Sequence, residues 1–115
     1  MIEDKVREFL ESKLSVPVLM EVPKGPEPSF VVIEKTGSSQ INLVSTSILT
    51  IQSYAPSLYE AALLNDLVKD WMLDGMVGLI TLDRVSNVSL NSDYNYTDTS
   101  TKRYRYQAVF EIIHY

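Results

Sequence analysis

The pattern of apolar and polar positions begins with an amphipathic helix. Apolar residues recur every three to four positions along the first part of the chain, as one face of a helix requires. Glu3, Asp4, Glu8 and Glu11 lie mostly in the N-terminal half, where acidic side chains interact favourably with the helix dipole. The pattern predicts a helix over 2–14.

Strand-like segments follow this helix. The segment 16–22 is typical of a short strand, which Pro17 confines to a strand start or a sheet edge. The proline-rich segment 23–28 is predicted to be a loop, and the continuous apolar run 30–35 a strand with a central place in the sheet. The polar segment 36–40 is predicted to be the turn that leads to the next strand.

The next segment, 41–54, is long for one strand, and its apolar residues change from one face to the other along its length. A bulge or bend near 45–47 would reconcile the two halves. Pro56 then ends the strand, because proline has no N–H to donate to the ladder. This unit of strand and corner leads directly into a second helix.

Ser57 and Glu60 have the spacing of a capping box at the start of this helix. In that arrangement the serine oxygen accepts from the Glu60 amide, and the glutamate side chain reaches back to the Ser57 amide. The helix is predicted to end at Gly75. Its apolar stripe consists of Ala61, Leu64, Val68, Trp71 and Met72.

The C-terminal part of the chain predicts a hairpin. The apolar segment 77–82 fits a short strand or a helical turn, and the alternating segments 84–90 and 103–113 are predicted strands. Between them, the polar segment 91–101 is typical of a long hairpin loop or a protruding β-arm tip. The element order predicts one α+β domain over 1–115, with a largely antiparallel or mixed β-sheet, two amphipathic helices on one face and a long protruding C-terminal hairpin.

Composition narrows the class of protein. The chain has 115 residues, of which 45% are hydrophobic, enough for one core that needs no metal or disulfide. It has no cysteine, which removes disulfides and cysteine-based zinc sites. Its net charge of −5 disfavours sequence-independent binding of nucleic acid over the whole surface. No apolar run approaches the length of about 20 residues that spans a membrane, so we expect a soluble cytoplasmic product.

Side chains that could carry chemistry are scarce. His114 is the one histidine and lies next to the last residue, where a general base seldom finds a positioned partner. Asp66, Asp70 and Asp74 recur every four residues and share one helix face. Such a face could bind a hard cation, but it is far more often a solvated surface. We therefore expect no catalytic residue, no bound metal and no cofactor.

One basic cluster lies among tyrosines near the end of the chain. Its members are Lys102, Arg103 and Arg105, beside Tyr94, Tyr96, Tyr104 and Tyr106. Alternating strand faces, with tyrosines half-buried and arginines solvated, would produce the same pattern. Tyrosine and arginine are also enriched in protein interfaces, and interleaved aromatic and basic residues can bind single-stranded nucleic acid. All three interpretations stay open, and the protein interface is the stronger of the two functional ones.

The order of segments resembles a known family. A V-P-V strand, an F-V-V-I strand and the sequence I-Q-S-Y-A immediately before S-x-x-E-A-A are followed by R-Y-x-x-x-F-E-I at the end of a polar hairpin. The segments 51–62 and 103–112 carry most of the resemblance. The chain is similar to the small tail terminator, or tail-completion, proteins of long-tailed bacteriophages and prophages, also called tail-to-head joining proteins.

The resemblance implies a structural role in the virion tail, after assembly in the cytoplasm of a bacterial host. Members of this family form a ring, usually a hexamer, that caps the tail tube, stops its polymerisation and joins it to the head connector. Loops and β-arms make their contacts, so the matching region is 91–105, with the loop 23–28 as a second candidate. DNA would pass through such a ring without specific binding, and an acidic wall would suit that passage.

Two other classes of function stay open. The chain could be a small, non-catalytic cytoplasmic adaptor that binds a protein partner through its sheet edge and hairpin. The weakest interpretation is an enzyme that uses carboxylates and a divalent metal. The neighbouring genes would separate the first alternative from a tail protein, and stabilisation by added metal would support the second.

Overall fold

The computed structural model describes residues 2–24, 28–75, 85–98, 100 and 103–114. In chain order the helices and strands are α1 (Ile2–Lys13), β1 (Val18–Leu19), β2 (Phe30–Ile41), β3 (Val44–Ala55), α2 (Leu58–Asp70), the π-helical turn η1 (Trp71–Gly75), β4 (Val85–Asn95) and β5 (Tyr104–His114). None of the helices in these ranges is long and apolar enough to cross a membrane.

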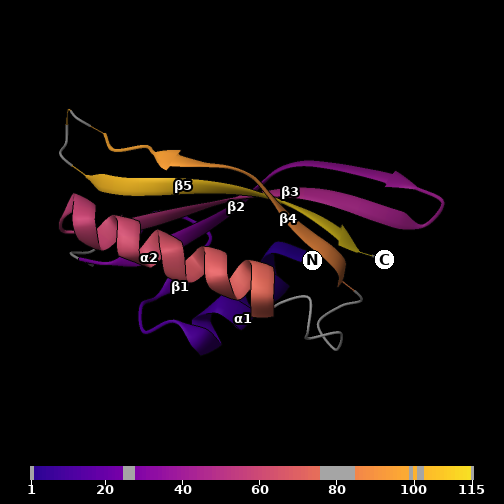
Figure 1. Cartoon of the computed structure of the whole chain (residues 1–115), viewed down its shortest axis with the longest axis horizontal. Coiled ribbons are helices and arrows are strands. Elements are labelled where there is room, and N and C mark those ends of the chain that lie inside the picture. Colours follow the sequence, from indigo (N-terminus) through magenta and orange to yellow (C-terminus); the bar gives the residue numbers. More distant parts are fainter. Residues whose placement is uncertain (1, 25–27, 76–84, 99, 101–102, 115) are drawn as a thin grey trace.

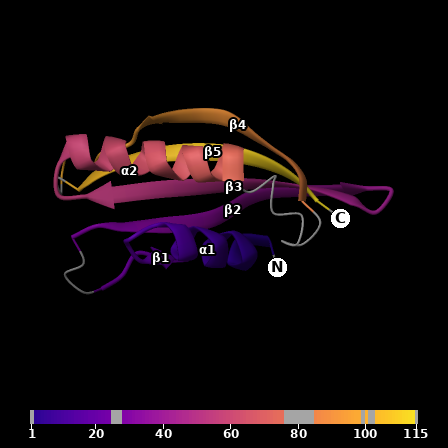
Figure 2. The same ribbon diagram turned by 60° about the horizontal axis from the view of Figure 1, so that its bottom comes forward.

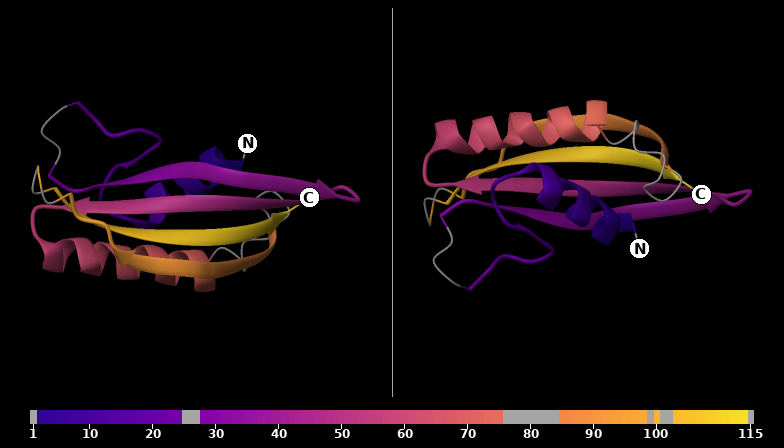
Figure 3. Two further views of the ribbon diagram at one scale, coloured as in Figure 1. Left: turned by 90° about the horizontal axis from the view of Figure 1, so that it is seen from above. Right: turned by 90° about the horizontal axis from the view of Figure 1, so that it is seen from below.

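The strands form one mixed sheet with the order β1-β2-β3-β5-β4 (Figure 1). β1 is parallel to β2, and the other neighbouring strands are antiparallel. Both helices lie on the same face of this sheet, and the opposite face is left open (Figure 3). The predicted α+β class is therefore confirmed, and β4 and β5 form the expected C-terminal hairpin.

The main core lies between the helices and the sheet. Apolar side chains of β2, β3 and β5 point toward the helices at every second position, for example Ile33, Ile51 and Phe110. The helices supply the other side of the core through Val6, Leu10, Val68 and Met72. A smaller cluster on the open face consists of Phe30, Val32 and Tyr54, with Leu19 packed against them.

The start of α2 follows the predicted cap in part. The Ser57 hydroxyl accepts a hydrogen bond from the Glu60 amide at 3.2 Å and donates one to the Glu60 carboxylate at 3.1 Å. The glutamate thus binds the serine hydroxyl, where the capping box predicts its backbone amide. At the other end, the Trp71 N–H is shared between the Leu67 and Val68 carbonyls, and the helix widens into η1. The predicted helix end at Gly75 is where η1 ends.

The hairpin of β2 and β3 differs from the prediction. The predicted turn at 36–40 is wrong, because β2 continues to Ile41 and its polar residues pair with polar residues of β3. The turn lies at Asn42 and Leu43, whose φ angles are 52° and 67°. The irregularity predicted near 45–47 lies instead in β2, between Lys35 and Gly37. Figure 2 shows this hairpin extending beyond both helices.

Other strand limits also differ from those predicted. β1 is shorter than the segment 16–22 and pairs only with Val31 and Val32, so the rest of the β2 edge has no strand beside it in the described part of the chain. β4 is longer than predicted and continues to Asn95, through much of the segment expected to be a loop. Its length is maintained through two register shifts against β5. The apolar segment 77–82 lies outside the described residues.

Candidate functional site

Aromatic and arginine side chains gather on the open face of the sheet, at the end that carries the β4–β5 turn. The members of this aromatic–arginine cluster are Phe30, Tyr54, Tyr94, Tyr96, Arg103 and Arg105. Strand register brings them together: Phe30 is paired with Tyr54, and Tyr54 with Arg105. Paired residues of adjacent strands point to the same face, so β2, β3 and β5 contribute to one surface, to which Tyr94 adds β4.

Arg105 is the centre of the cluster. Its Nη1 donates to the Tyr54 hydroxyl at 2.8 Å, and its Nε donates to the Tyr96 carbonyl at 2.6 Å. The guanidinium carbon also lies 4.5 Å from the Tyr96 ring centroid and 5.6 Å from that of Tyr54. These cation–π contacts and hydrogen bonds hold the side chain in one place on the sheet.

A stacked aromatic pair forms the base beside Arg105. The rings of Phe30 and Tyr54 are 4.5 Å apart and nearly parallel, and both residues are buried. Arg103 lies above both rings, with its guanidinium carbon 5.9 Å from each centroid. This packing fixes the base of the cluster before any partner arrives.

A row of side-chain hydrogen bonds crosses the same face. The Gln52 amide donates to the Gln107 carbonyl oxygen at 2.8 Å, and the Gln107 amide donates in turn to the Tyr94 hydroxyl. Tyr54 joins the row by donating to the Gln52 oxygen at 3.2 Å. Tyr94 and Tyr96 meet edge to face at 5.8 Å and stay 42% and 45% exposed. The cluster therefore exposes large aromatic rings to solvent, and hydrogen bonds and ring contacts already hold these rings in place.

Charge distinguishes this surface from the rest of the chain. Neither Arg103 nor Arg105 forms an ion pair with a carboxylate in the described ranges, whereas the whole chain carries a net charge of −5. The cluster offers two cations, aromatic faces and hydroxyl groups, and tyrosine and arginine are residue types enriched in protein interfaces.

The predicted cluster is brought together in part. The two tyrosines and two arginines expected at an interface, Tyr94, Tyr96, Arg103 and Arg105, do meet on one surface. Tyr104 and Tyr106 alternate to the helix side of the sheet, and Lys102 lies outside the described residues. Sequence reasoning missed the Phe30–Tyr54 base and the glutamine row. These contacts could be found only from the strand register, which depends on pairing between segments that are distant in the chain.

The predicted acidic face lies on α2 and η1, where Asp66, Asp70 and Asp74 are all exposed. Asp66 is within 3.3 Å of the Lys69 amine, which also contacts Asp93 of β4 at 2.9 Å. The hydrogen bond from Lys69 to Asp93 raises the pKa of this lysine above its ordinary value. Within the described ranges, no three acidic or histidine side chains are grouped so that they could hold a metal ion.

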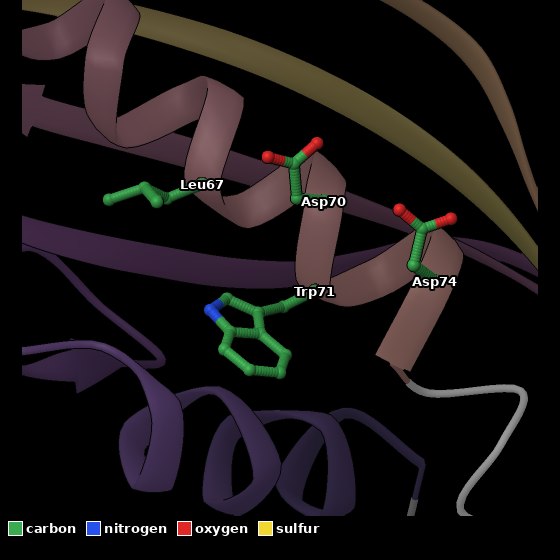
Figure 4. A pocket seen from close by; sticks show the side chains of 4 residues that line it. All are labelled: Leu67, Asp70, Trp71 and Asp74. Carbon is green, nitrogen blue, oxygen red and sulfur yellow. The ribbon is translucent and has the colours of Figure 1, made fainter.

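The described residues Leu67, Asp70, Trp71 and Asp74 line a hollow of about 480 Å³ (Figure 4). The Trp71 indole points toward α1, and its ring meets Phe9 edge to face at 6.5 Å. The Lys13 amine lies 5.2 Å from the same indole. The hollow is therefore lined by two apolar side chains and two carboxylates. We name it the α2 hollow.

A second hollow of about 330 Å³ lies at the base of the β2–β3 hairpin, and most of the described residues that line it are polar. The Ser47 hydroxyl and His114 Nε2 lie 2.9 Å apart beside it and join β3 to β5. Ser47 is only 3% exposed. This hydrogen bond fastens the end of β5 to the sheet.

Comparison with known proteins found no relative of this chain. No protein-family model matches the chain, and no curated protein matches it in sequence.

Proposed function

We propose that this chain is a structural protein of a long phage tail. It forms a ring that caps the tail tube, stops tube polymerisation and joins the tail to the head connector. The resemblance in segment order supports this function, and the aromatic–arginine cluster is the observation that carries its binding role. A terminator must hold other tail proteins through a fixed surface, and the side chains of this cluster are held in place as such binding requires.

The order of the cluster matters for affinity. Binding is weakened when long side chains must be immobilised, at about 0.5–1.5 kcal/mol for each one. Arg105 is already held by Tyr54 and by the Tyr96 carbonyl, and Tyr94 is held by Gln107. A partner therefore meets a surface whose side-chain entropy has largely been lost on folding. Aromatic and arginine residues are also the types that most often dominate binding energy.

The test uses the tail tube protein encoded beside the gene for this chain. Tube protein is polymerised with and without the purified chain, and tube lengths are measured by electron microscopy. We expect the chain to shorten the tubes and to be found at one tube end. Tubes of unchanged length with no chain at their ends would contradict the proposal, as would a gene with no tail genes near it.

A matched pair of variants tests the surface itself. The double variant Arg103→Ala/Arg105→Ala is expected to fold and to lose capping, because it removes both cations of the cluster. Lys5→Ala/Arg7→Ala removes the same charge from α1, on the other face of the sheet, and is expected to cap normally. If the two variants cap equally well, the aromatic–arginine cluster does not contribute to binding.

The adaptor interpretation is the second candidate. The guanidinium groups of Arg103 and Arg105 favour it, because they form no ion pair with a carboxylate of the described residues. One basic patch on an acidic chain suits a single acidic protein partner. An adaptor needs no self-assembly. Light scattering over a range of concentrations separates the two, since a chain that stays a monomer while it binds an acidic partner would favour the adaptor.

A further inference from the structure

The tip of the β2–β3 hairpin exposes apolar side chains. Ile41 is 73% exposed and Leu43 is 80% exposed, on either side of Asn42. Leu43 also has a φ of 67°, in the left-handed region that a leucine seldom adopts. Asparagine tolerates this region, but the usual residue at the second position of such a turn is glycine. The leucine side chain therefore has no evident role in forming the turn.

The hairpin that carries this tip is uncharged. From Thr36 to Gln52 the sequence contains no Asp, Glu, Lys or Arg, although these residues make up 22% of the chain. A hairpin end that faces only water usually carries charges that keep other chains away. We name the part from Gly37 to Ile48, which are paired with each other, the arm.

A complementary surface lies on α2. Three residues at four-residue spacing, Tyr59, Leu63 and Leu67, are 73%, 46% and 50% exposed. Trp71 continues this row and forms, with Leu67, the apolar walls of the α2 hollow. The buried stripe of the same helix lies on a different side and includes Leu64 and Val68. Thus Tyr59, Leu63 and Leu67 form an exposed apolar row beside the buried stripe, and Trp71 continues this row while it also packs against the core.

The arm and the α2 hollow of one molecule do not meet. β3 is paired with β5 as far as Ser45, which holds the arm in line with the sheet. Figures 1 and 2 show the tip extending away from the helices. An arm fixed in this direction does not fold back onto its own α2, so a surface that covers its tip belongs to another molecule.

We infer that the arm of one copy inserts Ile41 and Leu43 into the α2 hollow of a second copy. Apolar side chains would then cover Leu67 and Trp71, and the Asn42 amide would donate to the Asp70 and Asp74 carboxylates that line the hollow. Two different patches meet in this contact, so it repeats from copy to copy and closes a ring or extends a filament. The inference rests on the self-assembly part of the proposed function, for which it names the two surfaces.

The absence of native cysteine makes a direct test possible. Leu43→Cys and Leu67→Cys are prepared as separate proteins, mixed, and oxidised mildly. We expect the mixed disulfide to form faster than either homodimer, because only a thiol on the arm meets a thiol at the hollow. As a control, Glu11→Cys on the exposed side of α1 replaces Leu67→Cys, and we expect little mixed disulfide.

Leu43→Gly separates assembly from folding. Glycine adopts a positive φ without strain, so the melting temperature is expected to be unchanged or higher. Self-association measured by sedimentation should fall by about tenfold or more, since the burial of one leucine side chain accounts for such a ratio. Unchanged self-association in this variant would overturn the inference.

The outcomes also separate this inference from the proposed function. If the chain forms oligomers without the mixed disulfide, the arm contact is wrong and the ring is made by other surfaces. If the chain stays a monomer and no disulfide forms, both self-assembly and the arm contact are wrong. If the mixed disulfide forms but tail tubes grow normally, the arm contact stands and the tail function fails.

Discussion

At the scale of single residues, the structure gives several side chains two contacts that hold them in place. Arg105 binds the Tyr54 hydroxyl and the Tyr96 carbonyl, and Ser57 both donates to Glu60 and accepts from it. Two contacts restrict the conformational entropy of each side chain already on folding, so little more is lost when a partner binds. Surface residues held in this way are ready for binding, and this is why the aromatic–arginine cluster is a stronger candidate than its exposed tyrosines alone would make it.

Trp71 is a residue whose replacement should lower stability without touching the aromatic–arginine cluster. It is half-buried and packs against Phe9 of α1. Trp71→Ala is expected to lower the free energy of unfolding by about 2 kcal/mol, less than the 3–5 kcal/mol typical of a fully buried ring. Chemical denaturation measures this change. Trp71→Phe keeps an aromatic contact with Phe9 and should lose less, and an equal loss in both variants would contradict the edge-to-face contact as the cause.

Single residues also mark the limits of sequence reasoning. Tyr94, Tyr96, Arg103 and Arg105 were predicted to gather because they are close in the chain. Tyr54 is equally central, but it joins them through pairing across a separation of 51 residues from Arg105. Local pattern contains no signal for such a contact. The same holds for Leu43, whose exposure follows from the position of the turn.

At the scale of elements, Lys69 connects α2 to β4 through Asp93. Hydrogen bonding to the charged amine raises its pKa in the folded chain. Its stabilising contribution is therefore complete below the ordinary lysine pKa, about 10.4, and is lost as the pH rises through the raised value.

Lys69→Met tests this connection. The variant is expected to be less stable by about 0.5–1 kcal/mol near neutral pH, because the pair is only partly exposed. The difference from the parent chain should disappear well above the raised pKa, where the amine is neutral in both states. Denaturation at a series of pH values measures it, with Lys5→Met as a solvent-exposed control. A difference that persists at high pH would assign the effect to packing of the lysine stem.

Helices and strands were predicted well where one hydrophobic pattern dominates their sequence. They were predicted poorly where the local composition favours a turn or loop but pairing with another strand keeps the segment extended. The apolar stripe of α1 and the alternation of β5 gave both elements within about two residues of their observed limits. Serine and glycine after Lys35 indicate a turn, yet pairing with β3 keeps that segment extended. Polar residues also continue β4 past Leu90 for the same reason. Tertiary pairing overrides local propensity in both strands.

At the scale of the whole molecule, the chain is elongated, with extents of 44 × 24 × 23 Å and distinct features at its two ends. One end carries the aromatic–arginine cluster beside the β4–β5 turn, and the arm extends from the other end (Figure 1). This separation lets copies contact one another through the arm while the cluster stays free for a different partner.

Shortening the arm tests this division of roles. Replacing 39–46 by Asn-Gly joins Ser38 to Ser47 through a two-residue turn of the favoured type. The core residues are untouched, so cooperative unfolding should be retained, while self-association is lost. Light scattering and thermal unfolding measure the two properties. If the shortened chain still assembles, the contact between copies lies elsewhere on the molecule.

The free edge of β2 has a consequence for hydrogen–deuterium exchange. β1 covers only Val31 and Val32, so backbone amides further along β2 that point away from β3 lack a strand across from them in the described part of the chain. In a solution of separate molecules these outward amides should exchange quickly, and those that point toward β3 slowly. A partner that adds a strand to this edge would slow every second amide and leave the others unchanged. Alternate-residue protection along β2 would thus distinguish pairing at the edge from docking at the tip.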